Sequence, residues 1–298
     1  KVIKRPGRRW QRDCDMEIVN GELIVTYTDG TQDNLGNVST GEPTVDSRLI
    51  FTLQDDGTYE VTLDTKYKDT VTDISIPSTY NGIAVTAIGE KAFEQCSLLT
   101  TVTIPSSVTT IKEYAFSQCT HLKDTSLQNI ESVGDYAFSG CTNLTNISIP
   151  RISSMGSYAF KDCSSLQNIS LPTTLTEISR GAFWGCSSLT NVSLPATLTN
   201  IGDTSFNNCS FSSIVIPKSV TYIGPSAFTD NDQLQTVYFE KTDGWYRNRT
   251  ITNPAVWQIV SENSLKDPEK AASLLLETGK ISSGGTYAYY WRQNPPLQ

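Results

Sequence analysis

The sequence is poor in charge and in histidine. Among its 298 residues, 18% are charged and one is a histidine. The low charge argues against a disordered polyelectrolyte, and a single histidine leaves little for histidine-based chemistry. Lysine and arginine number 23 against 31 aspartates and glutamates, which gives a net charge of −8. This acidic balance argues against a nucleic-acid-binding protein, because such a protein needs a basic face to displace counterions.

Long apolar runs and catalytic motifs are absent as well. No stretch of 18 apolar residues occurs, so we expect no membrane span in the sequence given. There is no Gly-x-Ser-x-Gly motif, phosphate loop or dinucleotide fingerprint. His121 lies in an expected turn with no nucleophile motif to complete a triad. We therefore expect no enzyme, no catalytic residue and no cofactor.

A repeat of 22 or 23 residues fills the middle of the chain. A phenylalanine, usually after alanine, recurs at intervals of 23, 22, 22, 23, 23 and 22 residues. A cysteine follows it by three positions in every copy except the last, which has Asn231 there. An Ile-Pro or Leu-Pro pair marks the same phase, except at Leu127-Gln128. The recurring residues are Phe93, Phe116, Phe138, Phe160, Phe183, Phe206 and Phe228, with Cys96, Cys119, Cys141, Cys163, Cys186 and Cys209.

Each unit divides into a short strand and a returning arm. In one copy Ile147 and Ile149 point to one side, while Asn146 and Ser148 point to the other. The arm is too short for a full crossover helix, so successive units are expected to stack as parallel coils. A single coil buries too little apolar surface to offset its own ordering, so neighbouring coils must share ladders and a core.

The pattern Leu-x-x-Ile/Val-x-Ile/Leu-Pro … Ile-Gly-x-x-Ala-Phe-x-x-Cys-x-x-Leu over about residues 71–239 resembles the BspA-like leucine-rich repeats. The resemblance implies a leucine-rich-repeat solenoid: a right-handed, curved stack of about seven 22–23-residue coils with a parallel β-sheet. We expect an N-terminal β-hairpin cap and a C-terminal α/β cap. The resemblance also implies a secreted or cell-surface protein of a bacterium that binds host or neighbouring-cell molecules.

Turn signals in the N-terminal flank predict hairpins. Residues 47–64 alternate around Asp56-Gly57, and this hairpin is expected to cover the first coil. Asn81-Gly82 predicts an extra turn within that lengthened coil, and Asp29-Gly30 predicts a separate hairpin over Glu22–Leu35. A basic arm precedes it, which we interpret as a linker end, with binding to an anionic surface as the alternative. Its charges are Lys1, Lys4, Arg5, Arg8, Arg9 and Arg12.

The C-terminal flank predicts one helix and an aromatic strand. Asp267 should cap a helix that starts at Pro268, runs to about Glu277 and ends at Gly279. Aromatic residues gather around it and are interpreted as a hydrophobic cap, with a glycan-binding platform as the alternative. They are Trp245, Tyr246, Trp257, Tyr287, Tyr289, Tyr290 and Trp291.

Four parts are therefore expected along the chain: residues 1–40, a basic arm and small β-hairpin module; 41–70, the N-terminal hairpin cap; 71–240, the BspA-like repeats; and 241–298, the C-terminal cap.

The cysteines and the acidic clusters are not expected to hold metals. No close Cys-x-x-Cys pair occurs, so no zinc site is predicted, and the cysteine column is interpreted as free, buried thiols. Cys14 stands outside this column. Two acidic clusters could hold calcium but lack the full EF-hand loop, and we interpret them as solvated turns. They are Asp13, Asp15 and Glu17, and Asp230 and Asp232.

Two columns of strand residues form the most regular expected surface. They carry small uncharged side chains and almost no ion pairs, unlike an active site. We interpret them either as an ordinary soluble strand face or as a partner-binding surface. The central column is Thr103, Ser126, Ser148, Ser170, Ser193, Val215 and Tyr238. Its neighbour is Thr101, Asp124, Asn146, Asn168, Asn191, Ser213 and Thr236.

The leading hypothesis is a non-enzymatic surface protein that mediates protein–protein interaction or adhesion through the solenoid. Its partner would be an unidentified protein or glycan, for which a host matrix protein is one candidate. The first alternative is a carbohydrate-binding module that uses the C-terminal aromatics. The second is an enzyme accessory, or a hydrolase whose catalytic part lies outside this sequence. The step to adhesion rests on the resemblance.

Overall fold

The structure is a computed structural model that describes residues 14–19, 22–27, 32–37, 45–248, 258–280 and 286–293. The chain divides into two compact units, Lys1–Val45 and Asp46–Gln298.

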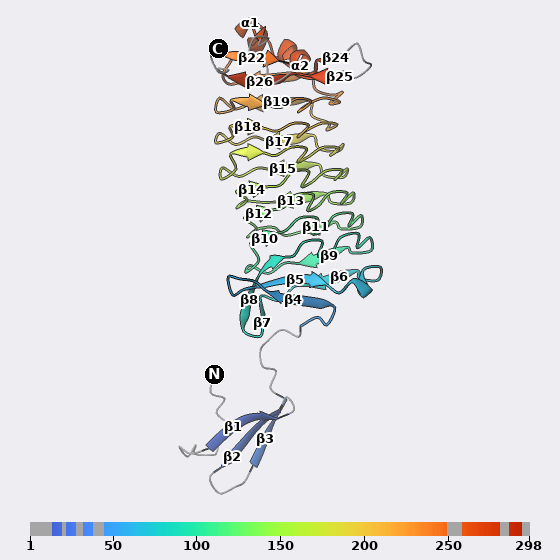
Figure 1. Cartoon of the computed structure of the whole chain (residues 1–298), viewed down its shortest axis with the longest axis vertical. Helices are drawn as coiled ribbons and strands as arrows, with labels where there is room; N and C mark the ends of the chain where they lie inside the picture. Colours follow the sequence, from blue (N-terminus) through green and yellow to red (C-terminus); the bar gives the residue numbers. More distant parts are fainter. Residues whose placement is uncertain are drawn as a thin grey trace. The chain divides into compact units, whose positions relative to one another are not determined.

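The first unit holds an antiparallel sheet in the order β1 (Cys14–Val19), β2 (Glu22–Tyr27), β3 (Gln32–Asn37) (Figure 1). The β2–β3 pair confirms the expected hairpin, whose Asp29-Gly30 turn lies outside the described residues. Strand β1 was not expected. Asp15 and Glu17 lie within it, so their interpretation as turn residues is wrong: they alternate with Met16 and Ile18 at the two-residue period of a strand.

Residues 1–13, and with them Asp13 and the basic arm, lie outside the described residues.

The second unit contains a β-solenoid of about eight coils, which confirms the solenoid prediction (Figure 1). Each coil contributes one short strand to a row of parallel strands. Six of these strands form one sheet and the last two form a separate pair. In chain order they are β6 (Asp73–Ser75), β9 (Thr101–Thr103), β11 (Asp124–Thr125), β13 (Asn146–Ser148), β15 (Asn168–Ser170), β17 (Asn191–Ser193), β19 (Ser213–Ile216) and β21 (Thr236–Phe239).

The returning arms form a second parallel ladder, which was not expected from the sequence. The arms carry an apolar pair three residues apart, such as Val220 and Ile223, and in most arms the second residue of the pair lies in a two-residue strand. The strands are β8 (Ile83–Ile88), β10 (Thr110–Ile111), β12 (Ser132–Val133), β14 (Ser154–Met155), β16 (Glu177–Ile178), β18 (Asn200–Ile201) and β20 (Tyr222–Ile223). The ladder is interrupted between β14 and β16.

The Ala-Phe segment of each coil closes the turn and bonds to the next coil. The N–H of Phe93 donates to the carbonyl of Ala115 at 2.7 Å, and the N–H of Phe116 to that of Ala137 at 2.7 Å. Residues two before and two after each phenylalanine adopt left-handed backbone, as Tyr136 (φ 54°) and Gly140 (φ 75°) do. Successive coils therefore share a main-chain ladder at this corner too.

Phenylalanines and cysteines fill the core as two continuous columns. The repeat phenylalanines are buried, and their rings stack in parallel, 5.1 Å apart for Phe93 and Phe116. The six repeat cysteines are free and buried, which confirms the prediction. Each thiol after the first donates to the phenylalanine carbonyl of the preceding coil, as Cys141 does to Phe116 at 3.1 Å. Asn231 continues this column, with its amide donating to Phe206 at 2.7 Å.

The N-terminal hairpin covers the first coil as predicted. Strands β4 (Leu49–Leu53) and β5 (Tyr59–Leu63) pair antiparallel, and β5 then pairs with β8, so the hairpin extends the second ladder. A 3-10 turn, η1 (Thr65–Tyr67), follows. Strand β7 (Thr79–Tyr80) pairs with β8 across Asn81 and Gly82, whose φ angles of 50° and 75° form the expected extra turn.

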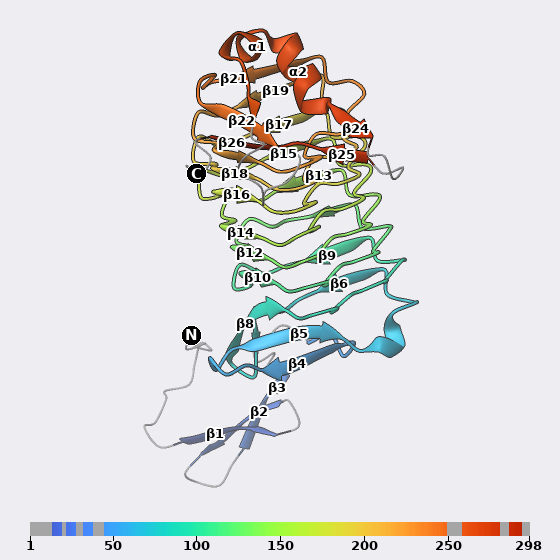
Figure 2. The same cartoon turned by 45° about the horizontal axis from the view of Figure 1, so that its top comes forward.

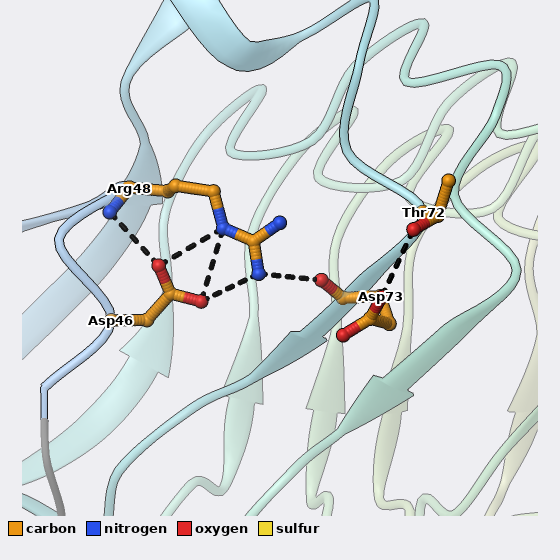
Figure 3. Close-up of polar contacts among 4 residues, drawn as sticks. All are labelled: Asp46, Arg48, Thr72 and Asp73. Atoms are coloured by element: carbon orange, nitrogen blue, oxygen red, sulfur yellow. Dashed lines mark hydrogen bonds and ion pairs between the residues drawn. The ribbon is translucent and has the colours of Figure 1, made fainter.

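Arg48 closes the free edge of the first strand row at β6 (Figure 3). Its Nη2 donates to the main-chain carbonyl of Asp73 at 2.9 Å, and Asp46 holds the guanidinium at 2.7–3.1 Å. Hydrogen bonding from Arg48 lowers the pKa of Asp46. Thr72 donates in turn to the Asp73 carboxylate at 2.9 Å. The main-chain carbonyl of Asp73 at this sheet edge, which would otherwise be unpaired, thus has a hydrogen-bond partner.

The C-terminal cap lies over the last coils (Figure 2). It contains α1 (Glu262–Lys266), α2 (Pro268–Leu276), β22 (Trp245–Asn248), β23 (Gln258–Ile259), β24 (Thr278–Lys280), β25 (Thr286–Ala288) and β26 (Tyr290–Gln293). Strand β26 pairs antiparallel with β20, and β22 and β23 continue this sheet beyond the parallel strands. Asp267 caps α2 as predicted, accepting from the N–H of Lys270 at 3.2 Å.

Two details of this cap differ from the prediction. Helix α1 was not expected. Gly279 does not end α2: the chain already turns extended at Glu277 (φ −60°, ψ 121°), and Gly279 lies in β24. A strand that follows the helix directly removes the need for a left-handed glycine there.

Candidate functional site

The candidate site is the strand face, which we define as the outward side chains of the first strand row. Alternation along each strand produces it, because Ile147 is buried while Asn146 and Ser148 are exposed. Parallel pairing then aligns like residues: Asn146, Asn168 and Asn191 are in register, and so are Ser148, Ser170 and Ser193.

The structure places most of the predicted columns on this face. Thr236 is half-buried, and only the backbone of Asp124 is described. The others are exposed: Thr101, Thr103, Ser126, Asn146, Ser148, Asn168, Ser170, Asn191, Ser193, Ser213, Val215 and Tyr238. Ser126 follows the end of β11 and has no partner in the ladder, in the coil where Leu127-Gln128 replaces the usual proline pair.

The columns are interrupted between β17 and β19, which do not pair. The sequence contains the cause. Five positions separate Cys186 from Asn191, but four separate Cys209 from Ser213, so one residue is missing before β19. Phe211 is buried in this shortened segment and packs edge-on against Phe206 at 5.5 Å.

The strand face also extends one coil further than predicted. Asp73 and Ser75 in β6 pair with Thr101 and Thr103. The signal was available, because Ile76-Pro77 marks the phase of this strand in the sequence.

Two shallow hollows lie side by side on the strand face. The first has a volume of about 450 Å³ over β13, β15 and β17 and is lined by Asn146, Ile147, Asn168, Ile169, Ser170, Asn191, Val192 and Ser193. The second, about 460 Å³, is lined by Gln167, Asn168, Ser187, Ser188, Thr190, Asn191 and Ser210. Asn168 and Asn191 belong to both, so the hollows join.

Three residues that line the second hollow were not predicted from the sequence. Ser187, Ser188 and Ser210 follow the repeat cysteines in the Cys-x-x-Leu part of the unit. The first position after the cysteine is serine or threonine in all six copies, whereas the second varies in polarity. Only the turn from core to strand brings these side chains beside the asparagine column.

The hollows offer uncharged hydrogen-bonding groups. No residue that lines either hollow is ionisable. Asn191 donates to the Oδ1 of Asn168 at 3.3 Å and to the hydroxyl of Thr190 at 3.2 Å. Among the described residues, the hydroxyls of Ser170 and Ser193 have no hydrogen-bond partner. The strand face can therefore both donate to and accept from a bound partner.

An apolar step follows the hollows along the stack. Val215 in β19 and Tyr238 in β21 are in register, and each is 49% exposed. Most large apolar side chains of the solenoid are buried, so this exposed pair stands out on an otherwise polar face.

Other candidate chemistry does not assemble into a site. His121 is exposed, and its Nδ1 lies 2.5 Å from the carbonyl of Ser97. Asp230 accepts from Asn207 at 3.2 Å within a turn, as expected. In the parts of the chain that the structure describes, no group of three or more metal-ligating side chains occurs. Burial raises the pKa of Cys96 to about 11 and raises the pKa of the other repeat thiols further.

Among the described C-terminal aromatics, Trp245, Tyr289 and Trp291 are buried and form a cap and not a platform. Trp245 and Trp291 are 1% and 2% exposed and pack against Phe239 at 5.3 and 6.2 Å. Indole faces that are buried cannot stack on a sugar, so the platform built on these tryptophans is wrong. Trp257 lies outside the described residues. Across those same residues, no helix has the length and apolar character needed to cross a membrane.

Comparisons with known proteins agree with this architecture. A family model described as the BspA type leucine-rich repeat region, in six copies, matches residues 66–163 and 153–270. A leucine-rich cell surface protein from Faecalibacterium prausnitzii is similar at 27% identity with a TM-score of 0.61, over 83% of this chain and 61% of that one. This chain thus spans less than two thirds of that relative.

A leucine-rich repeat protein from T. pallidum is similar at 23% identity with a TM-score of 0.47, over 56% of this chain and 89% of that one. The search of curated proteins produced no match.

Proposed function

Since the chain belongs to the BspA-type leucine-rich repeat family, we propose that it is a non-enzymatic, secreted or surface-exposed bacterial protein that binds a protein partner through its strand face. The observation that carries the proposal is the pair of joined hollows over β13, β15 and β17, lined by uncharged polar residues in register. A stacked solenoid presents such a surface rigidly and over a long distance.

The character of the hollows favours binding over catalysis. A catalytic site needs groups with perturbed pKa values near a nucleophile or a proton donor. The hollows have no ionisable lining residue. The repeat thiols, whose pKa values are raised, are buried in the core and do not line the hollows. A protein partner is favoured over a glycan because neither hollow is lined by an aromatic ring on which a sugar could stack.

Substitution of one exposed residue in the hollow tests the proposal. Ser170→Arg places a long charged side chain over the first hollow, and Thr176→Arg places the same side chain on the other side of the same coil. Each protein is tested against a panel of purified extracellular-matrix proteins by surface plasmon resonance. We expect at least one partner whose binding Ser170→Arg weakens about tenfold or more and Thr176→Arg leaves unchanged. Equal loss or no loss in both variants contradicts the proposal.

A further inference from the structure

We infer that the strand face recognises an uncharged, proline-rich segment in the polyproline II conformation, which lies along the stack and across β13, β15 and β17. The inference rests on the proposed function and specifies the class of its partner. Three observations carry it: the spacing of the polar rows, the hydrogen-bonding character of the hollows, and the apolar step beyond them.

The first observation is the spacing of the rows. Paired strands lie about 4.7–4.9 Å apart, so every second row of the strand face repeats at about 9.4–9.8 Å. A polyproline II helix turns once in three residues at about 3.1 Å each, or about 9.3 Å. Each turn would therefore present the same carbonyl to every second row, for example to Ser148 and Ser193, whose strands flank β15.

Ligands in other regular conformations match the spacing of the rows less well. An α-helix repeats at about 5.4 Å, which is longer than one row and shorter than two. A β-strand repeats every two residues, or about 6.6–6.8 Å, and also falls between one row and two. Only the polyproline II repeat stays in step over the three strands that carry the same polar pair.

The second observation is the hydrogen bonding that the hollows offer. A polyproline II backbone has no internal hydrogen bonds, and proline lacks an N–H, so such a segment presents mainly unpaired carbonyls. The hydroxyls of Ser170 and Ser193 and the amide of Asn168 can donate to them. The absence of ionisable lining residues favours a segment without charged side chains, because a buried charge there would find no partner.

The third observation is the apolar step. A segment that leaves the hollow past β17 meets Val215 and then Tyr238, each 49% exposed. Proline rings dock well on aromatic side chains, and aromatic surfaces are the usual partners of preformed polyproline II segments. Tyr238 would thus anchor the end of the segment, while the polar rows hold its backbone.

Peptide binding to the full chain tests the inference. The probes are decaproline, a glycine–serine decamer and a threonine–valine decamer, each fluorescently labelled and measured by anisotropy. We expect decaproline to bind most tightly. Ser170→Arg should weaken it about tenfold or more and Tyr238→Ala about threefold or more, whereas Thr176→Arg should not change it. Circular dichroism of each variant reports whether it is folded, and Tyr238 is exposed enough for its replacement to be tolerated.

Each outcome separates this inference from the proposed function. Tighter binding of either other peptide, lost in Ser170→Arg, overturns the polyproline II assignment and leaves the strand face as the binding surface. The polyproline II assignment is also overturned, and the strand face retained, if none of the three peptides binds while Ser170→Arg abolishes binding to a matrix protein. Failure of both assays in the wild-type protein overturns both proposals. Decaproline binding that Ser170→Arg leaves intact places the ligand elsewhere and also overturns the inference.

Discussion

The buried thiol column makes the protein sensitive to alkali. Burial raises the pKa of the repeat cysteines above the ordinary value of 9.0, to about 11 for Cys96 and further for the others. In the unfolded chain these thiols ionise above pH 9, while in the folded chain they remain protonated. The folded state then binds more protons, so the free energy of unfolding falls as the pH rises. The stabilisation is complete below about pH 8 and is lost from pH 9 upward.

The expected loss is large compared with the stability of a domain. At pH 10 an unfolded thiol with a pKa of 9.0 gains about 1.4 kcal/mol by ionisation, and a buried one gains almost nothing. Six such thiols therefore lower the free energy of unfolding by about 8 kcal/mol. Native domains have about 5–15 kcal/mol in total, so the protein should be close to unfolding at pH 10.

Urea unfolding of the wild-type protein and of Cys163→Ala, with a reductant present, measures this effect. At pH 7.5 the substitution should cost about 1–2 kcal/mol, because it removes the thiol bond to the Phe138 carbonyl and leaves a small void. At pH 10 that cost should shrink by about 1.4 kcal/mol, since the variant has one thiol fewer to ionise. The substitution changes no other ionisable group, so the difference between the two proteins isolates this thiol. Parallel pH dependences in the two proteins would refute the reasoning.

Three further changes test the packing. Phe160→Ala removes one stacked ring and should lower the free energy of unfolding by about 3–5 kcal/mol in urea titration. Asn231→Ala leaves the carbonyls of Phe206 and Phe228 unpaired and should lower the free energy of unfolding by about 1–3 kcal/mol. Asn231→Cys should recover part of this loss. Equal losses in the two variants would contradict the interpretation that Asn231 takes the place of a cysteine in the core column. Asp267→Ala removes the α2 cap and should lower the free energy of unfolding by about 1 kcal/mol, which is measured as a lower Tm. An unchanged Tm would show that the cap does not stabilise the protein.

The repeat itself could be predicted because its signal is redundant. Phenylalanine, cysteine and the proline pair each mark the same 22–23-residue phase, so the loss of one marker, as at Asn231, does not hide the unit. The column of buried thiols and the outward position of Asn146 and Ser148 follow from that phase and from strand alternation. Asp267-Pro268 likewise predicted α2 through local hydrogen bonding alone.

What could not be predicted depends on contacts between coils. The second ladder uses strands of two residues, such as β12, that are too short to show alternation and exist only because a neighbouring coil pairs with them. The break between β17 and β19 comes from one missing residue before Ser213. Its effect on pairing appears only when the coils are stacked.

The role of the C-terminal aromatic residues also could not be predicted from the sequence. Composition could not distinguish a cap from a platform, because both need several rings close together. The antiparallel pairing of β22 with β26 decides the matter, since it turns Trp245 and Trp291 into the core beside Phe239. Solenoid ends need such a cover to keep the last coil from exposing its apolar side.

The salt dependence of partner binding tests the central claim most directly, namely that the uncharged hollows of the strand face are the binding surface. The dissociation constant of a matrix partner should be measured from about 0.05 to 0.5 M NaCl. The account predicts a nearly constant value for the wild-type protein, because screening acts only on charges. The claim would be contradicted if the dissociation constant of the wild-type protein rose steeply with salt and Ser170→Arg had the same dissociation constant as the wild type.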